Sequence, residues 1–230
     1  MIIGRGWGQG PTHSQNLESW LAHTPGLRVL VPATPQDLSD SILALEGTAD
    51  PIVIIEHRWI HSVSGEVTLS VEDLDFLRPI RHSSKSPAEL TIVTWGLATF
   101  DALSAKRELV ELGVHAEVVQ LRELSMLNMT EIKASVEKTG NLLVVSNSWA
   151  PASFGDSILA QFSSASTPSA RTLRVAYPHE PEPTALDQLD GFHVADWRIV
   201  NAALELLGKP ERVPAEAPVD QPKGYDFGPF

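Results

Sequence analysis

The sequence predicts an α/β protein whose mostly parallel β-sheet carries helices on both faces. Apolar runs of strand length alternate with amphipathic stretches of helical spacing, which is typical of parallel strands joined by crossover helices. Residues 52–55 are all apolar, as is usual for a parallel strand buried on both faces. With 230 residues, of which 43% are hydrophobic, the chain can bury one large core or two smaller ones.

A first α/β block occupies the start of the chain. Apolar spacing predicts a helix over residues 17–21, and residues 28–31 have the composition of a strand. Another helix is expected to begin after Thr34, which can cap it, with Pro35 at its first position and Asp37 in its first turn. The apolar residues that we expect on the buried face of this helix are Leu38, Ile42 and Leu45.

A second, longer α/β block follows an interruption of the pattern. We assign residues 1–60 to the first block, 61–88 to an extended linker with at most one short strand, and 89–207 to the second block. Residues 208–230 form a proline-rich tail whose aromatic side chains are expected to dock on another surface. Strands of the second block are expected at residues 90–95, 114–121, 141–146 and 172–177. Its helices are expected at residues 100–112, 130–140, 154–162 and 197–207.

Composition excludes several classes of function. The net charge of −12 and the pI near 5.0 leave nothing to neutralise phosphates in bulk, so nucleic acid is not an expected partner. Apolar runs such as residues 142–145 are far shorter than the ~20 residues of a membrane span. No secretory signal opens the sequence, and we expect a cytoplasmic or organelle-matrix protein. The chain has no cysteine, which excludes disulfides, thiol catalysis and thiolate metal sites.

The opening of the chain is rich in glycine. Gly4, Gly6, Gly8 and Gly10 alternate with other residues, but no Lys-Ser/Thr pair follows, so the loop is not a P-loop. It also fails the dinucleotide-binding pattern. Two interpretations remain: a tight loop that needs positive φ angles, or a nest of backbone N–H groups that contacts an anion.

His13, directly after this loop, is the best single candidate for chemistry. An imidazole can exchange protons at neutral pH, although a histidine here can also simply bond the end of a helix. His23 stands at the far end of the predicted helix, where it can complement the helix dipole.

A second group of titratable residues follows the apolar strand at 52–55. Glu56 ends this strand, where active-site groups of parallel sheets tend to lie; the alternative is a pairing with Arg58 or a loop. His57 and His61 have a metal-like spacing, but they follow a strand and lack the His-Glu-x-x-His pattern, so we expect no zinc site.

Several segments of the first block together resemble a known family. Residues 10–15 (Gly-Pro-Thr-His-Ser-Gln), 23–27, 31–37 and 50–56 resemble the β chain of thiamine-diphosphate-dependent 2-oxoacid dehydrogenases, the E1 component of pyruvate and branched-chain complexes. The His-Ser-Gln triplet is fairly specific, since ordinary transketolases and deoxyxylulose-phosphate synthases carry other residues after the corresponding histidine.

The second block resembles the transketolase C-terminal domain of the same β chains. The resemblance is carried by residues 117–124, 135–140 and 174–178. It implies that residues 1–60 are the C-terminal half of a transketolase-like pyrimidine-binding domain and that residues 89–207 form a transketolase C-terminal domain.

The resemblance also implies a mechanism. In this family thiamine diphosphate lies between an α chain, which holds the diphosphate and magnesium, and the β chain. The activated cofactor attacks the 2-oxo carbon, carbon dioxide leaves, and the acyl unit passes to a lipoyl group on a partner E2 protein. By this resemblance His13 is catalytic and assists proton transfer, Gln15 and Glu56 lie beside substrate or cofactor, and no metal ligand comes from this chain.

The sequence departs from the family pattern in two places. The front half of the pyrimidine-binding domain, with the glutamate that activates the cofactor, has no counterpart here, and Glu56 matches a later family position. In the second block, Gln120 stands where the family has the Asp of Asp-Leu-Arg, and Ser-Asn-Ser at residues 146–148 replaces an acidic stretch.

We therefore expect a partial or split β-type E1 subunit, inactive alone, that works in a heterotetramer with an α-type chain and a second copy of itself. It would also need a source of the missing half-domain, supplied by a separate polypeptide or by assembly with a partner. One alternative is a non-catalytic dimerisation or scaffold subunit, which the missing glutamate favours and the His-Ser-Gln triplet disfavours. Another is a two-carbon transferase that delivers the acyl unit to a carrier protein, which the divergent second block allows.

Overall fold

The computed structural model of the protein describes residues 1–4, 10–46, 48–69, 77–163, 169–185, 188–189 and 191–215. Most of the opening glycine loop and the aromatic end of the tail lie outside these described residues. The strands are β1 (Ile2–Ile3), β2 (Arg28–Leu30), β3 (Ile52–Ile54), β4 (Glu56–His57), β5 (Ile80–His82), β6 (Leu90–Trp95), β7 (Ala116–Leu121), β8 (Asn141–Trp149) and β9 (Arg171–Tyr177). The helices are α1 (Gly10–His13), α2 (Glu18–Ala22), α3 (Pro35–Leu43), the 3-10 turn η1 (Arg58–Ile60), α4 (Ala98–Glu111), α5 (Thr130–Thr139), α6 (Phe154–Ala160) and α7 (Asp196–Leu206).

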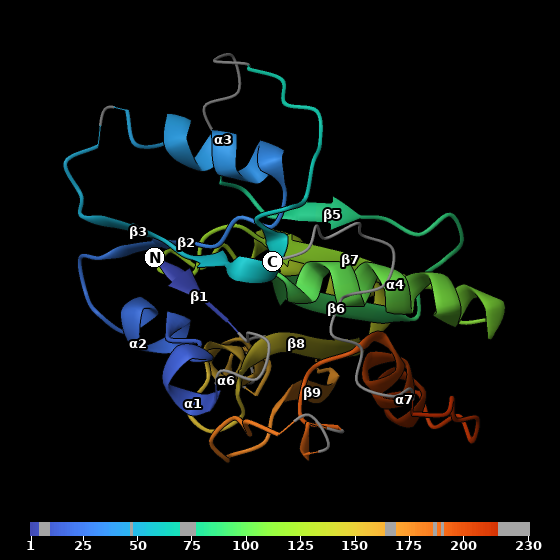
Figure 1. Ribbon diagram of the computed structural model, residues 1–230. Coiled ribbons are helices and arrows are strands. Elements are labelled where there is room, and N and C mark those ends of the chain that lie inside the picture. Colours follow the sequence, from blue (N-terminus) through green and yellow to red (C-terminus); the bar gives the residue numbers. More distant parts are fainter. Residues whose placement is uncertain are drawn as a thin grey trace.

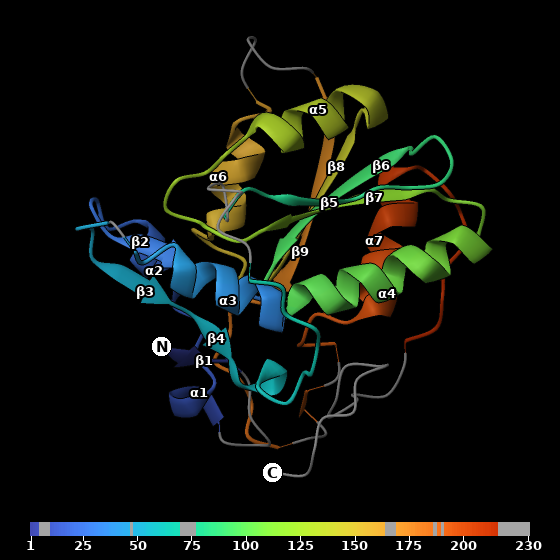
Figure 2. The ribbon, with the colours of Figure 1, turned by 90° about the horizontal axis from the view of Figure 1, so that it is seen from above.

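The second block is built on a five-stranded sheet with the order β5-β7-β6-β8-β9 (Figures 1 and 2). All neighbouring strands in it are parallel except β5, which runs antiparallel to β7 at one edge. The predicted mostly parallel sheet is therefore confirmed. Its edge strand comes from the segment that the sequence assigned to a linker.

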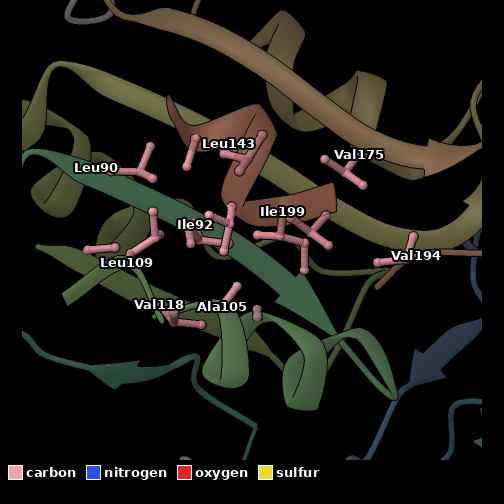
Figure 3. Packing of buried hydrophobic residues seen from close by; sticks show 14 of the residues in the cluster. Leu90, Ile92, Ala105, Leu109, Val118, Leu143, Val175, Val194 and Ile199 are labelled. Carbon is pink, nitrogen blue, oxygen red and sulfur yellow. The ribbon is translucent and has the colours of Figure 1, made fainter. Parts of the chain in front are cut away.

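Helices cover both faces of this sheet, as predicted (Figure 2). On one face α4 and α7 pack against the strands and form a fully apolar core; Figure 3 shows Ile92, Leu143 and Ile199 within it. On the other face α5 and α6 pack together with apolar residues of the first block, such as Val29 and Ile55. The two blocks therefore share one hydrophobic core.

The first block consists of two small parallel sheets that lie to one side of the large sheet (Figure 1). β2 pairs with β3, with Leu30 opposite Ile54, and β1 pairs with β4, with Ile2 opposite Glu56. The expected burial of residues 52–55 on both faces is wrong for β3, whose three residues are only half-buried. Within the described residues β3 has β2 as its one neighbouring strand, which leaves much of its surface uncovered.

The predicted start of α3 is confirmed by a reciprocal capping box. Thr34 Oγ1 accepts from the Asp37 backbone N–H at 3.1 Å, and the Asp37 carboxylate accepts from the Thr34 N–H at 3.0 Å. These two bonds satisfy N–H groups that the first helical turn would otherwise leave without partners.

The predicted buried face of α3 is wrong. Ile42 and Leu45 are 53% and 39% exposed and Leu38 is half-buried, whereas Asp37 and Ser41 are buried. The helix turns its polar side toward the second block because Asp37 meets a hydrogen-bond donor there. Gln120 Nε2 of β7 donates to Asp37 Oδ2 at 2.7 Å.

Gly4 makes the tightest backbone approach in the first block. It has a φ of +96°, and a Cβ atom at this position would lie 2.1 Å from Nε2 of His57. Gly26 has a similar φ of +82° but nothing within 4 Å of its Cβ position. We expect Gly4→Ala to lower the free energy of unfolding by about 1–3 kcal/mol more than Gly26→Ala, because only the first adds a steric clash to the backbone cost. Urea unfolding of both variants measures the difference, and equal losses would show that His57 moves aside freely.

Candidate functional site

His13 is the last residue of the four-residue helix α1, and its side chain is exposed. No hydrogen bond or ion pair joins this imidazole to any other residue in the described part of the chain. Gln15 is also exposed, and its carbonyl accepts from the Gly4 N–H at 3.2 Å, which ties the residues after His13 to the end of β1. The structure thus presents an accessible imidazole on an anchored segment.

Glu56 lies on β4, beside β1, and is half-buried. Its carboxylate is 3.2 Å from Nε2 of His61, which lies in the turn after η1, so its partner is a loop residue and not Arg58. Among the described residues no ion pair or hydrogen bond joins Glu56 to His13. Both residues flank β1, but the structure does not bring their side chains into contact.

The other histidines of the first block have local structural roles. His23 is exposed and is the C-terminal cap residue of α2. His57 is buried, and its Nδ1 accepts from the Trp59 N–H at 3.2 Å. Across the described ranges, no group of three or more His, Cys, Asp or Glu side chains could hold a metal ion.

Glu18 is the titratable residue of this region that sequence reasoning missed. It begins α2, two positions after Asn16, and is only 2% exposed. The side chains of Trp95 and Ser148 in the second block lie close enough to its carboxyl group to act on its pKa. Burial raises the pKa of Glu18 from 4.5 to about 7, although the backbone and these two polar neighbours oppose the shift. An acid in a first helical turn is normally exposed, so its sequence position gave no signal of burial.

Two hollows lie beside Glu18. A cavity of about 20 Å³ is lined by polar groups of Glu18, His57 and Asn147 among apolar residues. An open cleft of about 530 Å³ lies between α2 and the connection from β8 to α6, with Trp20 and Trp149 among its lining residues. The cleft lies at the carboxyl end of β8, the edge of a parallel sheet where ligands usually bind.

The raised pKa of Glu18 has a measurable consequence for stability. An acid whose folded pKa of about 7 exceeds its unfolded value of 4.5 stabilises the fold most when protonated, and this contribution is lost as the pH rises through 7. Between about pH 4 and pH 8, we expect the free energy of unfolding of wild type to fall by on the order of 3 kcal/mol relative to that of Glu18→Gln. Chemical unfolding of both proteins across this range tests it. Parallel stability curves for the two proteins would contradict the assignment.

No helix in the described part of the chain is long and apolar enough to cross a membrane.

Comparison with known proteins places the second block in a family. Residues 79–198 match the family model for the transketolase C-terminal domain. A solved structure described as "Split gene transketolase, inactive beta4 tetramer" has the same fold, with a TM-score of 0.68 over 91% of this chain and 66% of that chain, at 18% identity.

Curated relatives extend the similarity beyond this domain. The acetoin:2,6-dichlorophenolindophenol oxidoreductase subunit beta of Cupriavidus necator is 32% identical over 184 residues, 79% of this chain and 54% of that protein. Pyruvate dehydrogenase E1 component subunit beta is 34% identical in Drosophila melanogaster (mitochondrial; 67% of this chain, 43% of that protein) and 32% in Bacillus subtilis (72% and 51%). The chain spans about half the length of the curated relatives it matches.

Proposed function

This chain belongs to the transketolase C-terminal domain family and is homologous to pyruvate dehydrogenase E1 β subunits, and we propose that it is a β-type subunit of a thiamine-diphosphate-dependent 2-oxoacid dehydrogenase E1. The proposed reaction is the oxidative decarboxylation of a 2-oxoacid with acyl transfer to a lipoyl group on a partner protein. The subunit is active only when assembled with an α-type chain and a second copy of itself.

The observation that carries this proposal is the presentation of His13. Its imidazole is exposed and has no hydrogen-bonding or ionic partner among the described residues, so both ring nitrogens are available to a reacting group. The residues that follow it are fixed to the rest of the protein through Gln15 and Asn16. An accessible imidazole on a fixed segment suits a group that moves protons during catalysis.

In the proposed assembly, thiamine diphosphate and its magnesium ion are held mainly by the α-type chain. When bound, thiamine diphosphate would supply the nucleophilic carbon that attacks the 2-oxo group. This chain contributes the His13 imidazole, which holds or releases a proton at one ring nitrogen, and exposed Gln15 next to it. Glu56, paired with His61, is assigned only a place beside the site.

A non-catalytic scaffold subunit is the second candidate. Large apolar side chains are exposed on the first block, with Trp20 75% and Ile42 53% exposed, and such residues favour burial against partner chains. Both candidates therefore involve assembly, and only the first requires a cofactor.

Assembly and cofactor binding can be measured together. The chain is co-expressed with an α-type E1 chain and the products of its neighbouring genes, the complex is isolated by size-exclusion chromatography, and thiamine diphosphate is titrated calorimetrically with magnesium present. We expect binding by the complex and none by either chain alone. A stable complex that binds no thiamine diphosphate would leave the scaffold candidate, and failure to form any complex would overturn the subunit assignment.

A further inference from the structure

The residues that follow His13 are attached to the second block at two points. Asn16 Nδ2 donates to the carbonyl oxygen of Asn147 in β8. Ser19 Oγ accepts from the backbone N–H of Phe154, the first residue of α6, at 3.0 Å. Both contacts join residues more than 130 positions apart in sequence. The second block therefore holds the segment that carries His13.

Glu18 lies between these two attachment points and is the buried acid of the segment. Ser148, a polar neighbour that lowers the pKa of Glu18, also lies 3.1 Å from Ser146, Oγ to Oγ. Within the described residues no cation forms an ion pair with Glu18. A buried carboxyl group without a cation is costly, so it needs neutral polar neighbours. Ser148 and Trp95 are such neighbours, and both lower the pKa of Glu18.

A small hydrated site would complete the surroundings of Glu18. Its Oε2 atom and Nδ2 of Asn147 are both buried without a partner among the residues that the structure describes, and both residues line the cavity of about 20 Å³. A cavity of this size can hold one water molecule, which would bridge the two atoms. His57 of β4 is the other titratable side chain that lines it.

We propose that Glu18 is a positioning residue: its buried carboxyl group, between the attachment points at Asn16 and Ser19 and beside Ser148, fixes residues 14–19 on the carboxyl end of β8 and thereby sets where His13 is presented. The neutrality of Ser148 is essential to this contact, because a carboxylate in its place would face Glu18 without a donor between them. The catalytic importance of this placement rests on the proposed function, but the placement itself does not.

Hydrogen exchange of the complete chain tests the contact without partner or cofactor. Deuterium uptake is measured at about pH 8 for wild type, Ser148→Asp, Glu18→Gln and the double variant. Ser148→Asp is expected to speed exchange in residues 14–22 roughly tenfold, and adding Glu18→Gln is expected to reverse most of that change, because the repulsion needs both carboxylates. Exchange in residues 141–145 of β8 serves as the internal reference for intact folding.

A matched control is available in the same cleft. Ser157 also lines it and is exposed, so Ser157→Asp adds the same charge without approaching Glu18 and is expected to leave exchange in residues 14–22 unchanged. The proposal is overturned if Ser148→Asp leaves exchange in residues 14–22 unchanged, or if the double variant exchanges as fast as Ser148→Asp. The proposal is also overturned if Ser148→Asp speeds exchange in residues 141–145 and the double variant does not return to the wild-type rate there. Failure of the assembled protein to bind thiamine diphosphate would affect only the proposed function.

Discussion

His13→Ala is expected to lower kcat for 2-oxoacid decarboxylation by the assembled enzyme about 10²–10⁴-fold, the usual contribution of a positioned proton-transfer group. The residue is exposed and has no other hydrogen-bonding role among the described residues, so its removal should leave the fold intact. His179→Ala is the matched control, since His179 is also exposed but lines neither of the two hollows; its kcat should stay within about twofold of wild type. Full activity of His13→Ala would remove the proton-transfer role assigned to this residue.

Arg122→Met is expected to lower the free energy of unfolding by about 3–5 kcal/mol, because it leaves one buried carboxylate, Asp37, and one half-buried carboxylate, Asp40, without their cation. Nη1 of Arg122 lies 2.6 Å from Asp40 Oδ2 and 3.8 Å from Asp37 Oδ1, and its guanidinium side chain is only 6% exposed. These contacts join α3 of the first block to Arg122, the residue that follows β7. Urea unfolding followed by tryptophan fluorescence measures the loss.

Arg174→Met provides the comparison for Arg122. Arg174 pairs with Asp156, but both side chains are more than a third exposed, so solvent screens the pair. We expect Arg174→Met to lower the free energy of unfolding by no more than about 1 kcal/mol. Equal losses for the two arginine variants would show that the buried network contributes little to joining the blocks.

Much of the second block could be predicted from sequence because its signals are local. Strand-length stretches rich in apolar residues correspond to β6 and β8, and Gly140, with a left-handed φ of 65°, ends α5 where the sequence placed the stop. The start of α3 was equally predictable, since Thr34 and Asp37 are three positions apart and cap each other.

The buried face of α3 could not be predicted, because it depends on contacts between distant residues. Apolar periodicity favoured Ile42 and Leu45, but the helix instead buries Asp37 against Gln120, 83 positions away. The contact also explains a departure from the family pattern. A carboxylate at position 120 could not donate the hydrogen bond that the Gln120 amide gives to Asp37.

In the candidate site, too, one residue could be predicted from the sequence and one could not. His13 was found because its neighbours form a recognisable motif, whereas Glu18 looked like an ordinary acid in a first helical turn. Its burial depends on Trp95 and Ser148, which only the fold brings to it. The neutral stretch at residues 146–148 looked like a loss of acidic residues, but one of its members, Ser148, is a polar neighbour that lowers the pKa of this buried acid.

Turnover by the assembled protein is the most direct test of the proposed catalytic role. The complex of this chain with an α-type chain is supplied with thiamine diphosphate, magnesium and an artificial electron acceptor, and carbon dioxide release is measured from pyruvate and from branched 2-oxoacids. We expect release from at least one 2-oxoacid that requires thiamine diphosphate and both chains. A complex that binds the cofactor but releases no carbon dioxide from any of these substrates would contradict the catalytic assignment.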